Sequence, residues 1–125
     1  MSEAVTDDLR LVTESSVLAY PALEVRPDRA LQDDNYGERL RALKRLVRDP
    51  HESLVVTSIQ ALLQPAPARQ RLSDETRALR VGQTLEGDNV ARGLTERGYH
   101  ATCAVELPGE FSLRCGILDL YASDW

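Results

Sequence analysis

The 125-residue sequence contains no apolar run that approaches the roughly 20 residues needed to cross a bilayer. Its first ten residues are acidic and lack the basic and apolar regions of a signal peptide. With a single lysine, Lys44, and a net charge of -5, the chain has no basic excess, which argues against a protein that coats nucleic acid. We therefore expect a cytosolic, globular chain with no membrane association.

Motifs that would support catalysis or metal binding are also scarce. The two cysteines, Cys103 and Cys115, are too few for a disulfide framework and form no metal-spaced cluster with His51 or His100. We expect reduced, buried thiols and no bound metal. Neither G-x-x-x-x-G-K-[ST] nor G-x-G-x-x-G occurs, and neither histidine has a catalytic partner nearby in the sequence. The sequence predicts neither enzyme activity nor a cofactor.

The first half of the sequence predicts a strand followed by a helix. Residues 16–25 form a short apolar run that Pro21 interrupts, so a strand should end near Tyr20. Residues 36–48 repeat apolar side chains at spacings of three and four, which predicts a helix with one apolar stripe. Basic residues on its other faces fit a solvated surface better than a phosphate-binding one. The stripe is Tyr36, Leu40, Leu43 and Val47; the basic residues are Arg39, Arg41, Lys44, Arg45 and Arg48; the candidate N-caps are Asp33, Asp34 and Asn35.

Residues 53–63 begin with a β-branched run that does not alternate, a pattern typical of strands covered on both faces. Either Thr57 or Ser58 could cap the short helix that follows. With the preceding strand and helix, this run predicts a right-handed βαβ unit. Residues 64–75 contain two prolines and many charges, so they are the best candidate domain boundary. We expect a partial α/β domain over residues 1–70.

Residues 76–125 show a different pattern, typical of a small α+β domain. Residues 78–85 fit a strand, and the following run fits a short helix that Gly98 ends. The runs 99–106 and 111–121 predict the two strands of a C-terminal β-hairpin.

The loop of this predicted hairpin decides which side chains share a face. A two-residue loop at the Pro-Gly pair would set apolar against polar faces, so we expect a three-residue loop or a bulge with Gly109 at positive φ. One such register places Cys103 opposite Cys115. Arg114 then points away from the apolar face, and Gly116 is its next neighbour on that side. A solvent-side arginine and an interface anchor both fit this position, and spacing does not choose between them.

A series of ordered motifs supports a resemblance to a known family. In the second half these are Val81-Gly82, the helix near 88–97, Gly98-Tyr99, Gly109-Glu110 and the strand "RCGILDLY" from Arg114. They resemble the domain shared by bacterial transcription-repair coupling factor (Mfd) and the excision nuclease B subunit (UvrB). The runs "VLAYPALEVRPD", "ERLRALKRL" and "LVVTSIQALLQPAP" are similar to the helicase-like first domain that precedes it. UvrB proteins carry a long DNA-gripping hairpin where this chain has only "RALQDDNYG", so the resemblance favours the coupling factor.

The resemblance implies a non-enzymatic protein-interaction module of nucleotide excision repair. Its expected partner is the excision nuclease A subunit (UvrA), with only indirect association with DNA, and the implied contact residues are Arg114 and Gly116. It also implies a fragment truncated at both ends, because the family's translocase and RNA-polymerase-binding domains are absent. The alternatives are a fragment of an ATP-dependent helicase or translocase that contacts DNA through the helix at 36–48, and a truncated reading frame without function.

Overall fold

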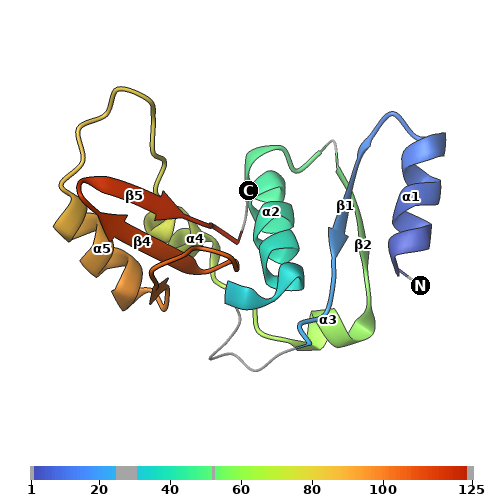
Figure 1. Ribbon diagram of the computed structural model, residues 1–125. Coiled ribbons are helices and arrows are strands. Elements are labelled where there is room, and N and C mark those ends of the chain that lie inside the picture. The colour runs from blue at the N-terminus through green and yellow to red at the C-terminus, as the bar shows by residue number, and fades with distance from the viewer. Residues whose placement is uncertain (1, 25–30, 52, 124–125) are drawn as a thin grey trace.

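The computed structural model describes residues 2–24, 31–51 and 53–123. Helices and strands are mixed, at 43% and 18%, which confirms the predicted α/β class. Figure 1 shows two parts side by side, each with its own small sheet. We call residues 2–63 the N-terminal unit and residues 87–123 the C-terminal unit. None of the helices described is long and apolar enough to cross a membrane.

The sheet of the N-terminal unit consists of β1 (Ser16–Tyr20) and β2 (Ser53–Thr57), which pair in parallel along their whole length. α2 (Asp34–Arg48) connects them, so the predicted parallel strand–helix–strand order is confirmed. Figure 1 shows the sheet between α2 and α1 (Ser2–Val12). Both helices pack mainly against β1. Residues 25–30, which lie between β1 and α2, are outside the described part.

The two strands differ in how far helices cover them. Val17 and Tyr20 point to opposite faces of β1, and both are buried. Leu54 and Val55 are successive residues of β2, and both are exposed. The prediction that this β-branched run is covered on both faces is therefore wrong. The strand that has buried residues on both faces is β1. β-Branched residues also suit an edge strand, so composition alone could not separate the two cases.

α2 begins where the sequence predicts, but a different face of it is buried. The Asp33 carboxylate accepts a hydrogen bond from the Asn35 N–H at 2.9 Å, which makes Asp33 the N-cap. The buried positions are Gly37, Arg39 and Ala42. The predicted apolar stripe is only half-buried. Small side chains and one arginine therefore form the closest contacts of this helix.

The prediction that the basic residues of α2 are solvated is wrong for Arg39, which is 4% exposed. Its guanidinium lies 4.2 Å from the centroid of the Tyr20 ring. It donates hydrogen bonds to the carbonyl oxygens of Pro21 and Pro65 and to the side-chain oxygen of Gln64. The planar fork of arginine satisfies several acceptors at once, and this makes its burial among neutral oxygens feasible.

α3 (Ile59–Leu63) follows β2 as the sequence predicts. The Ser58 hydroxyl accepts a hydrogen bond from the Ala61 N–H at 3.2 Å and caps the helix. The core of the N-terminal unit lies where β1, α2 and α3 meet, and its buried residues are Tyr20, Ala42 and Ala61. Two alanines let the backbones of both helices approach the end of β1.

α4 (Arg69–Glu75) lies in the segment 64–75, which the sequence predicts as a boundary between domains. The helix has no buried residue and no side-chain N-cap. An i,i+4 ion pair between Arg71 and Glu75, 2.8 Å long, supports it locally. The domain boundary itself stays a prediction.

Residues 78–85 do not form the predicted strand, and none of the described strands pairs with them. Their backbone turns back on itself, because the Gln83 N–H donates to the Arg80 carbonyl at 3.1 Å. Gly82 has φ 84° in this turn, a value that favours glycine. Val81 is fully exposed at its tip. The strand prediction is wrong because it takes Val81 as a strand residue, whereas this apolar side chain lies in a polar turn.

α5 (Gly87–Glu96) ends as the sequence predicts. Gly98 has φ 86° and donates its N–H to the Thr95 carbonyl, while the Tyr99 N–H donates to the Leu94 carbonyl. These two bonds form a Schellman motif, which satisfies carbonyls at the end of the helix.

The sheet of the C-terminal unit has the order β3 (His100–Ala101), β4 (Glu110–Arg114) and β5 (Ile117–Leu120). β3 runs parallel to β4, and β4 runs antiparallel to β5. The predicted hairpin between 99–106 and 111–121 is therefore wrong. The first predicted strand is reduced to the two residues of β3, which run parallel to β4 where a hairpin would need them antiparallel. The second predicted strand divides into β4 and β5.

The two units meet near the start of α2. The Ser123 hydroxyl donates to the Leu31 carbonyl at 2.6 Å. Gly37 lies so close to this segment that a Cβ there would overlap the carbonyl oxygen of Ser123. Gly109 has φ 81°, as predicted, and a Cβ there would lie 2.8 Å from the Leu31 Cβ. Glycines thus permit the close approach of the two units.

Candidate protein-interaction site

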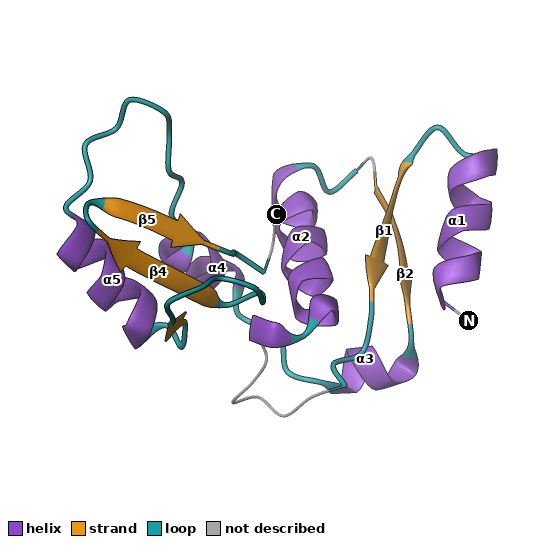
Figure 2. Cartoon of the chain, viewed as in Figure 1, coloured by secondary structure: helices purple, strands orange, loops and turns teal. Residues whose placement is uncertain are grey.

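The turn between β4 and β5 is two residues long. Cys115 and Gly116 have φ 51° and 80°, and two positive values in succession are the requirement of a type I′ turn. Arg114 and Ile117 form the last pair before the turn. Figure 2 shows the turn at the end of the hairpin farthest from α2. The expectation that Gly116 neighbours Arg114 on one face is wrong, because Ile117 takes that place.

The two faces of the β4–β5 hairpin differ in their surroundings. Cross-strand partners share a face, so Ser112, Arg114, Ile117 and Asp119 lie on one side, which we call the outer face. α5 lies against the other side, where Gly87 contacts Leu113. The residues of that inner face are Phe111, Leu113, Leu118 and Leu120. Arg114 therefore points away from α5.

Arg114 is exposed on the outer face. Within the described part of the chain, no hydrogen bond or ion pair engages its guanidinium. Ile117 shares this face and is 64% exposed, and Tyr121, which directly follows β5, is 42% exposed. A planar bidentate donor beside apolar side chains suits a partner surface that offers a carboxylate within an apolar patch.

Only part of the outer face is accessible. Ser112 is 2% exposed, and its hydroxyl has no hydrogen-bond partner among the residues described. Arg114, Ile117 and Asp119 are exposed. Of the four residues of the outer face, Ser112 is therefore the one that a partner could not reach.

The carboxylate of Glu110, at the start of β4, has a structural role. The Glu110 carboxylate accepts hydrogen bonds from the N–H groups of Glu106 and Leu107, each at 2.9 Å. These bonds stabilise the charged form and lower the pKa of Glu110 below its ordinary value. Glu110 thus fixes the segment before β4, and a general-acid role is disfavoured.

The cysteines and histidines form no site. Cys103 and Cys115 are both free and exposed, so the prediction of buried thiols is wrong. They do not face each other either, because Cys115 lies in the turn and Cys103 lies outside any strand. His51 and His100 are exposed. No group of three or more His, Cys, Asp or Glu residues in the described ranges could hold a metal ion.

Comparison with known families defines the class of protein. Residues 78–125 match the family described as the UvrB interaction domain. The match includes α5, the β4–β5 hairpin and Arg114. The C-terminal part of the chain is therefore similar to the UvrB interaction domain, as its resemblance predicts.

Three curated relatives are transcription-repair-coupling factors. The chain is 32% identical to that of Bacillus subtilis over 123 residues, covering 96% of this chain and 10% of the relative. For Mycobacterium bovis the identity is 36% over 123 residues, covering 92% and 10%. For Staphylococcus haemolyticus it is 29% over 118 residues, covering 93% and 10%. The chain is thus related to the transcription-repair-coupling factors and spans about a tenth of their length.

Proposed function

We propose that this chain is a non-enzymatic interaction module of transcription-coupled nucleotide excision repair. In this proposal it docks on the excision nuclease A subunit (UvrA) through the outer face of the β4–β5 hairpin. The site residues are Arg114, which makes the contact, and Gly116, which shapes the turn that presents it. The match to the UvrB interaction domain and the relatives' names support the repair role. The observation that most supports the docking surface is the exposed guanidinium of Arg114 within the matched domain.

The two site residues have different roles in this proposal. Arg114 provides charge-assisted hydrogen bonds to a carboxylate of the partner, and the exposed Ile117 provides apolar contact area. Gly116 allows the tight turn that holds Arg114 on a short, ordered hairpin. A pre-ordered donor loses less conformational entropy on binding than a donor on a mobile loop.

Binding to the purified A subunit tests this proposal. The Arg114→Glu variant reverses the charge at an exposed site and should weaken binding by about 30-fold, as expected for an interface hot spot. Arg92→Glu is the matched control, because Arg92 is exposed on α5 and lies outside the outer face. Calorimetry or surface plasmon resonance would measure both variants. Equal binding by wild type and Arg114→Glu would show that Arg114 has no part in docking.

DNA binding through α2 is the weaker alternative. Arg39 is buried, and Arg45 and Arg48 each lie 3.4 Å from the Asp49 carboxylate, which reduces the free positive charge of this helix. We expect no salt-dependent DNA binding in a fluorescence anisotropy titration. Binding that falls with salt and is lost in Arg45→Glu would support the alternative. A non-cooperative thermal melt would instead favour a chain without function.

A further inference from the structure

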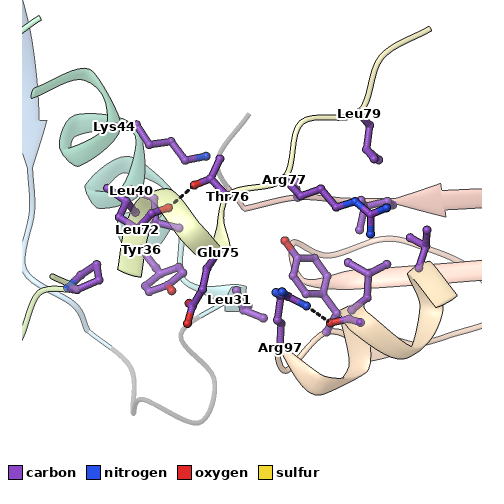
Figure 3. Close-up of a pocket in the computed structure, with 17 residues that line it drawn as sticks. Leu31, Tyr36, Leu40, Lys44, Leu72, Glu75, Thr76, Arg77, Leu79 and Arg97 are labelled. Atoms are coloured by element: carbon purple, nitrogen blue, oxygen red, sulfur yellow. Dashed lines mark hydrogen bonds between the residues drawn. The ribbon is translucent and has the colours of Figure 1, made fainter. Parts of the chain in front are cut away.

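A cavity of about 290 Å³ lies between α2, α4 and α5, where the two units meet. Figure 3 shows Leu40 and Leu72 on one side of it and α5 with Arg97 on the other. Its interior is mainly apolar. The apolar side chains that line it include Leu31, Leu40, Leu72, Val90, Leu94 and Leu120.

The charged residues around the cavity are mostly positive, although the whole chain has a net charge of -5. Lys44, Arg77 and Arg97 line it, and Glu75 is the only acidic residue among the lining residues described. The Glu75 carboxylate is already engaged by Arg71, at 2.8 Å. The rim therefore has a positive excess, and its electrostatic complement is a carboxylate.

Two features of the walls favour an occupant. α4 has no buried residue, so this wall is held by few contacts and can shift at small cost. Gly93 lines the cavity from the middle of α5, where glycine destabilises a helix by about 1 kcal/mol relative to alanine. A Cβ there would meet only the end of the Arg97 side chain, at 3.4 Å. The glycine leaves open a space that a larger residue would fill.

We propose that this cavity binds an acidic peptide segment of a partner protein. One large apolar side chain of the segment enters the cavity, and neighbouring carboxylates bind Arg77 and Arg97. The cavity volume lies near the lower end of the roughly 300–1,000 Å³ of small-ligand sites, which suits a single anchoring side chain. The site is separate from Arg114, because Leu120 lies on the inner face of the hairpin.

Three short fluorescent peptides test this proposal in anisotropy titrations with the full chain. The first has a central tryptophan flanked by glutamates, the second replaces the glutamates with lysines, and the third replaces the tryptophan with alanine. We expect the first to bind at least tenfold more tightly than the others. Equal binding of the lysine peptide, or no binding of the first peptide, overturns the proposal.

Variants of the chain locate the binding. Arg77→Glu should weaken the acidic peptide about tenfold, whereas Arg80→Glu, in the same exposed segment but outside the cavity, should not. Gly93→Leu should fill the cavity and abolish binding, with helicity by circular dichroism retained. Arg114→Glu should leave peptide binding unchanged. The peptide-binding proposal and the A-subunit docking proposal can therefore be refuted independently of each other. Undiminished binding in Gly93→Leu contradicts the proposal, as does loss of peptide binding in Arg80→Glu.

Discussion

Replacing Arg39 by alanine should destabilise the chain more than any other arginine substitution in α2. Arg39 contacts two separate segments: the end of β1, at the Tyr20 ring and the Pro21 carbonyl at 3.2 Å, and the end of α3, where the Gln64 side chain lies at 2.9 Å and the Pro65 carbonyl at 3.2 Å. Arg39 therefore links the end of β1 to the end of α3, together with the Gln64 side chain, which bonds to the Leu23 backbone. Alanine would remove the donor of the Pro21 and Pro65 carbonyls and would open a space beside the ring, whereas the Gln64 oxygen would keep the Leu23 N–H.

The size of the effect follows from opposing contributions. A cation–π contact contributes about 0.5–2 kcal/mol, and each hydrogen bond from a charged donor contributes about 1.5–3 kcal/mol. Burial of the cation costs several kcal/mol in lost hydration, and the partly buried acceptors regain water in the variant. We therefore expect a net loss of about 3 kcal/mol in the free energy of unfolding for Arg39→Ala. Arg39→Lys keeps the charge and loses the planar fork, so about half of that loss is expected.

Urea denaturation followed by far-ultraviolet circular dichroism measures these differences. The control is Arg48→Ala, since Arg48 is exposed on the last turn of the same helix and its removal should change stability by about 0.5 kcal/mol or less. If Arg39→Ala were as stable as the control, the contacts of Arg39 would not hold this unit together, and the reasoning would be refuted.

Three further substitutions test other parts of the structure. Gly37→Ala should separate α2 from Ser123, and faster amide exchange at the junction of the two units would report this; unchanged exchange would contradict the close approach. Gly116→Ala should destabilise the hairpin by about 1 kcal/mol, because its φ of 80° disfavours a side chain, and a wild-type melting temperature would argue against this turn. For Glu110, whose pKa is lowered in the folded chain, the stabilisation is present above the pKa of the unfolded chain and is lost as the pH falls through the folded one. The Leu107 amide resonance should therefore shift at a pH below the ordinary titration range of glutamate in wild type and stay constant in Glu110→Gln; the same shift in both would exclude this carboxylate as the cause.

Elements with local signals were predictable from the sequence. The stop at Gly98 is predicted directly, and the caps Asp33 and Ser58 are each one of the candidates that the sequence offers; all three depend on residues within one helical turn of the helix end. Arg39 shows the limit of such signals. Its acceptors lie 18 to 26 residues away along the chain, and an arginine at the same helical spacing on the solvent side would give the same pattern. The cavity is harder still to foresee, because its lining residues range from Leu31 to Ala122.

The sequence predicts the C-terminal hairpin in the wrong place because it contains two candidate turns. One is Pro108-Gly109, and the other is Cys115-Gly116. Pro-Gly at Gly109 is a strong turn signal, and Gly109 does have positive φ, but it leads into β4 from a strand that runs parallel. The actual turn has Cys115 at a position that favours asparagine, aspartate or glycine, so its signal was weak. The two-residue turn also changes which side chains of the two strands share a face, compared with one continuous strand. Ile117 therefore lies beside Arg114 on the outer face, and not with Phe111 as strict alternation across the turn suggests.

The corrected turn changes the physical meaning of the motif Arg-x-Gly. In an unbroken strand, Gly116 would act by leaving room beside Arg114. In the hairpin, Gly116 acts through the backbone, because its positive φ closes the turn that presents Arg114 and Ile117 as a pair. The two substitutions should then differ in kind: Gly116→Ala should lower hairpin stability and docking together, whereas Arg114→Glu should lower docking alone. A Gly116→Ala variant of wild-type stability that no longer binds the A subunit would instead give this glycine a direct contact with the partner.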